Sequence, residues 1–142
     1  ANSYPPNPEH TRMFDLGMDW AREHEARKQP VSIENDGLKL AGEYFDFGHK
    51  RCAIIFPGRT ESLYYSYYFA QPYAEAGCNI LVVDSRAHGL SEGKYNYCGT
   101  REWSDVIAWS RFAHDQLGCS DVVLHGICVG GAAVVLAAAK PE

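Results

Sequence analysis

The segment from Asp121 to Lys140 decides the fold, and it reads Asp-Val-Val-Leu-His-Gly-Ile-Cys-Val-Gly-Gly-Ala-Ala-Val-Val-Leu-Ala-Ala-Ala-Lys. Its first part predicts a short buried strand, and the alanine-rich part from Gly130 onward predicts a helix. Cys128 lies between them, with a glycine at the second position on either side. This Gly-x-Cys-x-Gly pattern predicts a nucleophile elbow, a strained turn between strand and helix that exposes its central side chain.

The predicted turn also provides groups that would assist chemistry at Cys128. The N-terminus of the following helix stabilises the thiolate form of a cysteine. The backbone N–H of Val129 is placed to hold a developing oxyanion. The alternative is that Cys128 is a small buried apolar residue in a glycine-rich turn built for close packing. Neither the dinucleotide pattern Gly-x-Gly-x-x-Gly nor a phosphate-binding Gly-Lys-Ser/Thr ending occurs here.

Outward from this turn, short apolar runs alternate with helix-forming segments. That alternation predicts an α/β fold with a mostly parallel sheet and helices on both faces. Alternating apolar residues around Asn35-Asp36-Gly37 predict a β-hairpin between Val31 and Phe47. The other predicted elements are a helix from Met13 to Lys28 that ends before Pro30, strands Cys52–Phe56, Asn79–Asp84 and Asp121–His125, and helices Leu63–Glu75, Arg101–Leu117 and Gly130–Lys140.

The loop after the first buried strand, Pro57 to Ser62, is a candidate for a second oxyanion donor. In folds with a nucleophile elbow this loop supplies a backbone N–H, and Arg59 is the first choice here, with Thr60 the second. The alternative is an ordinary turn in which Thr60 or Ser62 caps the next helix. The aromatic run from Leu63 to Phe69 is more typical of core and flank than of a pocket lining.

These segments together resemble the α/β-hydrolase superfamily, over roughly Val31 to Lys140. The resemblance is carried by the loop after the first buried strand, by the elbow, and by Asp-Ser-Arg-Ala-His-Gly-Leu-Ser at residues 84–91, which follows the pattern Asp-x-Arg-Gly-His-Gly-x-Ser. It implies that Asp84 and Arg86 form a structural ion pair and that His88 is not the catalytic histidine.

The sequence departs from the family pattern at three positions. Pro57 replaces a common histidine, Ala87 replaces a common glycine, and Cys128 replaces the usual serine. With cysteine at this position, the elbow is similar to that of dienelactone hydrolases and of acyl-CoA acyltransferases of the superfamily. A substitution of the usual serine by cysteine would give the same sequence.

A complete catalytic triad is not present in these residues. The family order is nucleophile, acid and then histidine, but all six histidines precede the elbow, and Glu142 is the only acid after it. His125 is predicted to be a packing residue, because strand alternation directs it away from the elbow. We therefore expect residues 1–30 to form an N-terminal extension and helix, and residues 31–142 to form a hydrolase core that is incomplete at its C-terminus.

Composition narrows the range of partners. A net charge of -5 and scattered basic residues argue against nucleic acid. The longest apolar run, Ala132 to Ala139, is shorter than the roughly 20 residues of a membrane span. No spacing suits a metal site, and no cofactor is expected. Five cysteines without a Cys-x-x-Cys pair favour a reducing cytoplasm.

The leading functional hypothesis is hydrolysis of an ester, lactone or thioester through an acyl-Cys128 intermediate, with the oxyanion held by the N–H groups of Val129 and Arg59. The substrate would be a small acyl compound, and the missing acid and histidine would come from a C-terminal half of the same protein. Two alternatives stay open. One is an acyltransferase that passes the acyl group to an amine or a thiol, and the other is a non-catalytic binding module.

Overall fold

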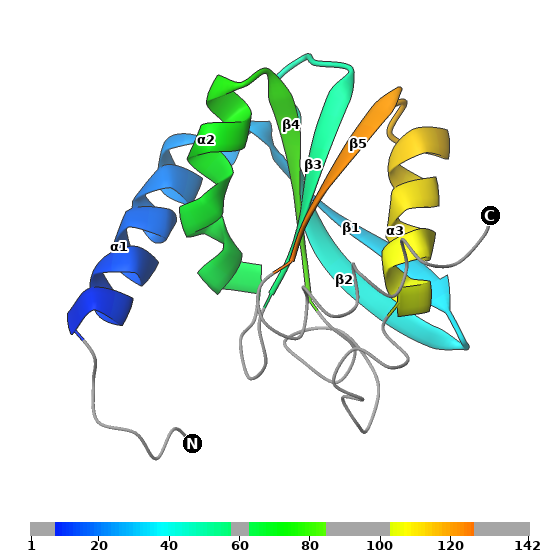
Figure 1. The fold of residues 1–142 in the computed structure, drawn as a ribbon, viewed down its shortest axis with the longest axis horizontal. Coiled ribbons are helices and arrows are strands. Elements are labelled where there is room, and N and C mark those ends of the chain that lie inside the picture. The colour runs from blue at the N-terminus through cyan, green and yellow to red at the C-terminus, as the bar shows by residue number, and fades with distance from the viewer. Residues whose placement is uncertain (1–7, 58–62, 85–102, 127–142) are drawn as a thin grey trace.

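A single mixed sheet forms the centre of the molecule (Figure 1). The computed structural model describes residues 8–57, 63–84 and 103–126. In that part of the chain the strands follow the order β1-β2-β4-β3-β5. Their bounds are Lys28–Asn35 for β1, Leu38–Phe45 for β2, Arg51–Phe56 for β3, Cys78–Val83 for β4 and Asp121–Gly126 for β5. Strands β4, β3 and β5 are parallel, and β1 and β2 run antiparallel.

Helices cover both faces of this sheet. On one face lie α1 (Pro8–Glu23), a 3-10 helix η2 (Leu63–Phe69) and α2 (Ala70–Glu75), and on the other face lies α3 (Trp103–Asp115). Figure 1 shows the sheet between these two groups of helices. The predicted α/β architecture, with a mainly parallel centre and helices on both faces, is therefore confirmed.

Strands β3 and β4 are buried on both faces and supply side chains to two separate cores. Ile54 and Leu81 point toward α3, where they pack with Trp109. Ile55 and Val82 point toward the opposite core. Strands buried on both sides are expected to be continuous apolar runs, as Cys52 to Phe56 is. The apolar runs in the sequence thus predicted the centre of the sheet correctly.

The predicted hairpin is present, and its turn shows why those residues are needed. Asn35 pairs with Leu38, so the turn consists of Asp36 and Gly37, whose φ angles are 53° and 73°. Two consecutive positive φ angles match the right-handed twist of a hairpin, and aspartate and glycine are the residues that adopt them most easily.

Both predicted ends of the first helix, Met13 and Lys28, are wrong. The helix α1 spans Pro8–Glu23, a 3-10 turn follows at Glu25–Arg27, and β1 begins at Lys28. Pro30 lies inside β1, opposite Glu43. Proline lacks a backbone donor and is tolerated in a strand only at an edge, and β1 is an edge of the described sheet.

The helix predicted from Leu63 to Glu75 begins as a 3-10 helix and becomes α-helical only at Ala70. Pro72 explains the delay, since it cannot donate to the carbonyl four residues earlier and its ring clashes with that carbonyl. It is tolerated in the first turn of α2. The aromatic run in η2 divides as expected for core and flank: Tyr67 is buried and Tyr64 is exposed.

The remaining described elements agree with their predicted ranges to within about two residues at either end. Strand β4 was expected at Asn79–Asp84 and β5 at Asp121–His125. Helix α3 lies within the range expected for it, Arg101–Leu117, whose first two residues fall outside the described chain. The loop predicted at 85–100 and the helix predicted at 130–140 also fall outside it.

The amino end of the central strands is held together by the side chain of Asn79. Its oxygen accepts the N–H groups of Phe47 and His49, at 2.8 and 3.1 Å. Its amide nitrogen donates to the hydroxyl of Tyr44 at 2.7 Å and to the carbonyl of His49 at 2.9 Å. Every hydrogen-bonding position of this buried amide is thus used, which ties the connection between β2 and β3 to the start of β4.

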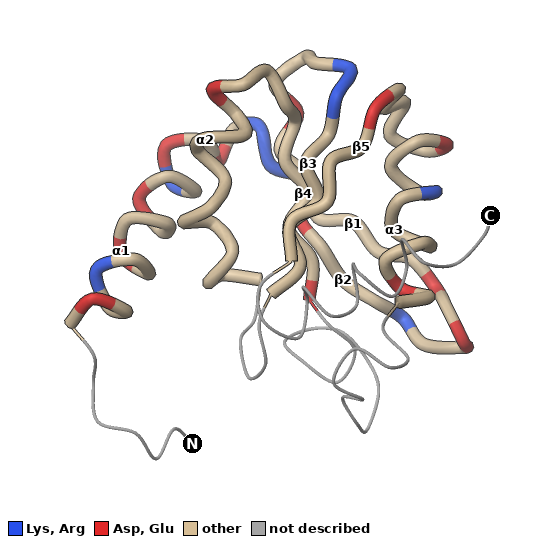
Figure 2. Tube along the Cα trace, in the orientation of Figure 1, with Lys and Arg blue, Asp and Glu red and all other residues tan. Residues whose placement is uncertain are grey.

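Most charged residues of the described molecule lie on its outer surfaces, and Asp84 and Asp105 are buried exceptions. Figure 2 shows charged residues of both signs interspersed along α1, while the middle parts of β3, β4 and β5 carry none. None of the helices in the described part of the chain is long and apolar enough to cross a membrane.

Helix α1 joins the core through a close contact at Gly17. A β-carbon at that position would lie 2.7 Å from the backbone nitrogen of Tyr68 and 3.0 Å from the β-carbon of Tyr67. The helix can therefore approach η2 closely only because Gly17 has no side chain. Trp20, one turn further along, is buried in the same core as Phe45 and Tyr67.

We expect Gly17→Ala to destabilise the protein by about 1–2 kcal/mol, because overpacking outweighs the higher helix propensity of alanine. Urea unfolding measures the change. The control is Leu16→Ala on the same helix, where the side chain is 46% exposed and the effect should stay within about 0.5 kcal/mol. A gain in stability for Gly17→Ala would contradict the close contact.

Candidate active site

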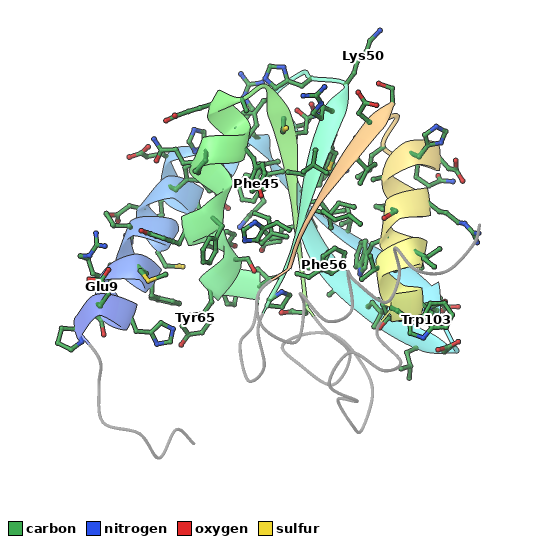
Figure 3. The ribbon with its side chains drawn as sticks, in the orientation of Figure 1. Glu9, Phe45, Lys50, Phe56, Tyr65 and Trp103 are labelled. Carbon is green, nitrogen blue, oxygen red and sulfur yellow. The ribbon has the colours of Figure 1, made fainter. Side chains whose placement is uncertain are left out.

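The carboxyl ends of the three parallel strands meet at one edge of the sheet. Phe56 at the end of β3 pairs with Gly126 at the end of β5, and Asp84 directly follows β4 on the other side of β3. Figure 3 places Phe56 and Lys50 at opposite ends of β3, with Trp103 of α3 toward the same edge as Phe56. Ligands of open α/β sheets bind outside this carboxyl edge.

The predicted site residues Cys128, Val129 and Arg59 lie outside the described residues, as do Thr60, Arg86 and His88. The structure does describe the strand ends that lead to them. Gly126 is two residues before Cys128, and Phe56 is three residues before Arg59. Because Phe56 and Gly126 are paired, the two strands that precede the predicted oxyanion donor and the predicted nucleophile end side by side.

Asp84 is a buried carboxylate at this edge, with only 3% of its surface exposed. It accepts a hydrogen bond from the backbone N–H of Leu63 at 2.7 Å. Its own backbone N–H donates to the carbonyl of Ala41 at 2.9 Å. The bond to Leu63 was not predicted from the sequence, which indicated only an ion pair with Arg86. No local pattern signals it, since its two partners are 21 residues apart.

His125 packs against the helical layer on the α2 side of the sheet. Its Nδ1 atom forms a hydrogen bond with the hydroxyl of Tyr73 at 2.7 Å. Its ring lies 5.1 Å from the ring of Phe69 and 5.5 Å from that of Tyr73, measured between centroids. Burial lowers the pKa of His125. The prediction that His125 is a packing residue is confirmed, and Tyr73 is a partner that sequence reasoning missed.

The described cysteines lack the environment of a nucleophile. Cys52, Cys78 and Cys119 are free and buried. Burial raises the pKa of the Cys52 and Cys78 thiols, so both stay protonated near neutral pH. Cys119 lies 3.7 Å from the hydroxyl of Tyr44 in the core beneath α3. These three side chains are packing residues.

Among residues 8–57, 63–84 and 103–126, no group of three or more histidine, cysteine, aspartate or glutamate side chains could hold a metal ion. What the described residues provide is a rigid frame, onto which the two predicted reactive segments are attached.

The sequence matches a family model described as the alpha/beta hydrolase fold over residues 54–142, and the chain belongs to this family. No curated protein matches the sequence significantly. Among solved structures, the Pyrococcus furiosus esterase Pf2001 is similar with a TM-score of 0.74 and 25% identity, over 82% of this chain and 48% of that one. The chain thus spans about half the length of that structure.

Two further structures share the fold. Est1E from Butyrivibrio proteoclasticus, which was solved with ferulic acid bound, has a TM-score of 0.65 and 26% identity, over 76% of this chain and 46% of Est1E. An alpha-beta serine hydrolase homologue from Coxiella burnetii has a TM-score of 0.64 and 19% identity, over 77% of this chain and 56% of the homologue. At that identity the likeness shows the fold alone.

The half-buried position of His125 predicts a pH dependence of stability. Its pKa is lower in the folded protein than the usual value of about 6.5, so the unfolded chain binds a proton first as the pH falls. Stability from the neutral imidazole is therefore complete above pH ~6.5 and is lost as the pH falls through the folded pKa. We expect His125→Gln to flatten the fall in unfolding free energy between about pH 7 and pH 5.

Urea unfolding at several pH values measures this effect. The matched control is His114→Gln on α3, whose side chain is 66% exposed, and this substitution should change the unfolding free energy by less than about 0.5 kcal/mol. An equally steep pH dependence in the His125 variant would show that another group is responsible.

Proposed function

We propose that the protein hydrolyses ester, lactone or thioester bonds through a covalent acyl-Cys128 intermediate. The observation that carries the proposal is the pairing of Phe56 with Gly126. It brings the chain leading to Cys128 next to the chain leading to Arg59, at the edge where this family places its chemistry. The likeness to the esterase Pf2001 supports the same class of substrate, and Est1E, which is also similar, was solved with ferulic acid bound.

In the proposed reaction the thiolate of Cys128 attacks the carbonyl carbon of the substrate, and a C–S bond forms as the carbonyl oxygen takes the negative charge. The N–H groups of Val129 and Arg59 hold that oxyanion. Collapse of the intermediate expels the alcohol or thiol, which takes up a proton. Water then attacks the thioester, the acid is released, and the Cys128 thiol is restored.

A general base is needed to take the proton from the thiol and from water. In the family order this base is a histidine oriented by an acid, and both follow the nucleophile in the chain. No histidine occurs between Cys128 and Glu142. The proposal therefore assigns the acid and the histidine to a C-terminal half of the same protein.

The second candidate is acyl transfer to an amine or a thiol, and the presence of cysteine at position 128 favours it. A thioester exchanges readily with such acceptors, whereas the oxygen ester of a serine enzyme does so less readily. Both candidates share the acyl-Cys128 intermediate and differ only in the group that removes the acyl chain.

We also propose that the protein acts in the cytoplasm. Cys52, Cys78 and Cys119 are all free thiols in the described part of the chain, as expected for a protein kept in a reducing compartment.

Denatured intact mass before and after treatment with p-nitrophenyl acetate tests the intermediate. We expect one acetyl group on the unsubstituted protein and none on Cys128→Ala. The control is Cys98→Ala, which should acetylate as the unsubstituted protein does. Acetylation that persists in Cys128→Ala, or is absent from the unsubstituted protein, would overturn the proposal and favour a non-catalytic binding module.

Turnover of the acetylated protein distinguishes the two candidates. If water alone restores the free thiol at the rate of substrate consumption, the protein is a hydrolase. If the acyl group leaves only when an amine or a thiol is added, the protein is an acyltransferase.

A further inference from the structure

The hydrogen bond between Asp84 and Leu63 joins two elements that flank the predicted oxyanion loop. Residues 58–62 lie between Pro57, which follows β3, and Leu63, which begins η2, and both of these flanking residues are buried. The N–H of Leu63 belongs to the first turn of a helix, where backbone donors have no partner within the helix. Asp84 supplies that partner from β4.

The carboxylate of Asp84 is itself held firmly. Its backbone is tied to β2 by the bond to the carbonyl of Ala41, and the preceding residue Val83 pairs with Gly42. A carboxylate that accepts a backbone N–H forms a charge-assisted hydrogen bond, which is stronger than a neutral one. Leu63 is therefore anchored to the sheet by polar contact as well as by its buried side chain.

The strand order shows which segment the hydrogen bond between Asp84 and Leu63 holds in place. Strand β3 lies between β4 and β5, so Phe56 has Gly126 on one side and the end of β4 on the other. The start of the loop is held by the pairing of β3 with β5, and its end is held by Asp84. Both ends of the segment that contains Arg59 are thus fixed relative to the strand that leads to Cys128.

We propose that Asp84 is a positioning residue for the oxyanion hole, acting through Leu63 on the loop that carries the Arg59 N–H. This inference rests on the proposed function. An oxyanion donor lowers the barrier only when it is held where the negative charge develops, and removal of one donor costs about 100- to 1,000-fold in rate. A donor that is displaced rather than removed is expected to cost less, about 10- to 100-fold.

Two reactions of the Cys128 thiol distinguish a displaced oxyanion donor from general damage to the structure. In acetylation by p-nitrophenyl acetate, the thiolate attacks a carbonyl, an oxyanion forms, and p-nitrophenolate leaves. In alkylation by iodoacetamide, the thiolate attacks a saturated carbon, a C–S bond forms as the C–I bond breaks, and no oxyanion arises. A displaced oxyanion donor therefore slows acetylation alone, whereas an altered Cys128 thiolate slows both reactions.

The experiment compares the rates of both reactions at Cys128, located by peptide mapping, in Asp84→Ala, Asp84→Asn and the unsubstituted protein. For Asp84→Ala we expect acetylation to slow about 10- to 100-fold while alkylation changes by less than about twofold. Asparagine keeps an oxygen that can accept the Leu63 N–H, so Asp84→Asn should recover most of the acetylation rate.

Asp105→Ala is the matched control, since Asp105 is also a buried carboxylate but accepts its 2.7 Å hydrogen bond from Asn35 in the hairpin. It should leave the ratio of the two rates unchanged. If Asp84→Ala does not fold, Asp84→Glu keeps the charge and displaces the oxygen, and it should acetylate more slowly than Asp84→Asn.

Equal rate losses in both reactions, or an unchanged acetylation rate in the alanine and glutamate variants, would overturn the positioning role. Failure of the proposed function has a different signature, because the unsubstituted protein would then show no acetylation at Cys128 at all.

Discussion

The burial of β3 and β4 on both faces is the constraint on which the rest of the structure depends. These strands have no solvent-facing side, so their side chains must alternate between the core beneath α3 and the core beneath α1 and η2. A shift of one residue in register would exchange those two sets of side chains. Because the register cannot slip, Phe56, Val83 and Gly126 lie at the same edge, and the chain segments that follow them start from fixed positions.

A polar side chain holds each end of this sheet, and the two side chains have different roles. At the amino end, Asn79 uses all of its hydrogen-bonding positions on the neighbouring connection and on Tyr44, which serves stability. At the carboxyl end, Asp84 binds Leu63 at the boundary of a loop that the family uses for catalysis. A rigid frame at that boundary is what electrostatic preorganisation requires, since donors that must move lose part of their effect.

Much of the fold could be predicted from short-range patterns. The apolar run Cys52 to Phe56 predicted a doubly buried strand, and Asp36-Gly37 predicted the hairpin turn, since each reflects a local periodicity or a φ requirement. One error arose where an edge position overrode a local rule. The first helix was expected to extend to Lys28 and to end before Pro30. Instead β1 begins at Lys28 and includes Pro30, because an edge strand does not need every backbone donor. The elbow at Cys128 stays a prediction carried by its spacing and by the family.

The sequence by itself determined the class of fold, the positions of most strands and the residue proposed as nucleophile, because these depend on the order of side chains along a few neighbouring turns. Only the tertiary structure decided the strand order, the bond from Leu63 to Asp84 and the bond from Tyr73 to His125. The partners in those bonds are 21 and 52 residues apart, so they meet only when separate helices and strands pack on the sheet. Hydrogen bonds of that kind depend on the relative placement of whole elements, which no local pattern of residues records.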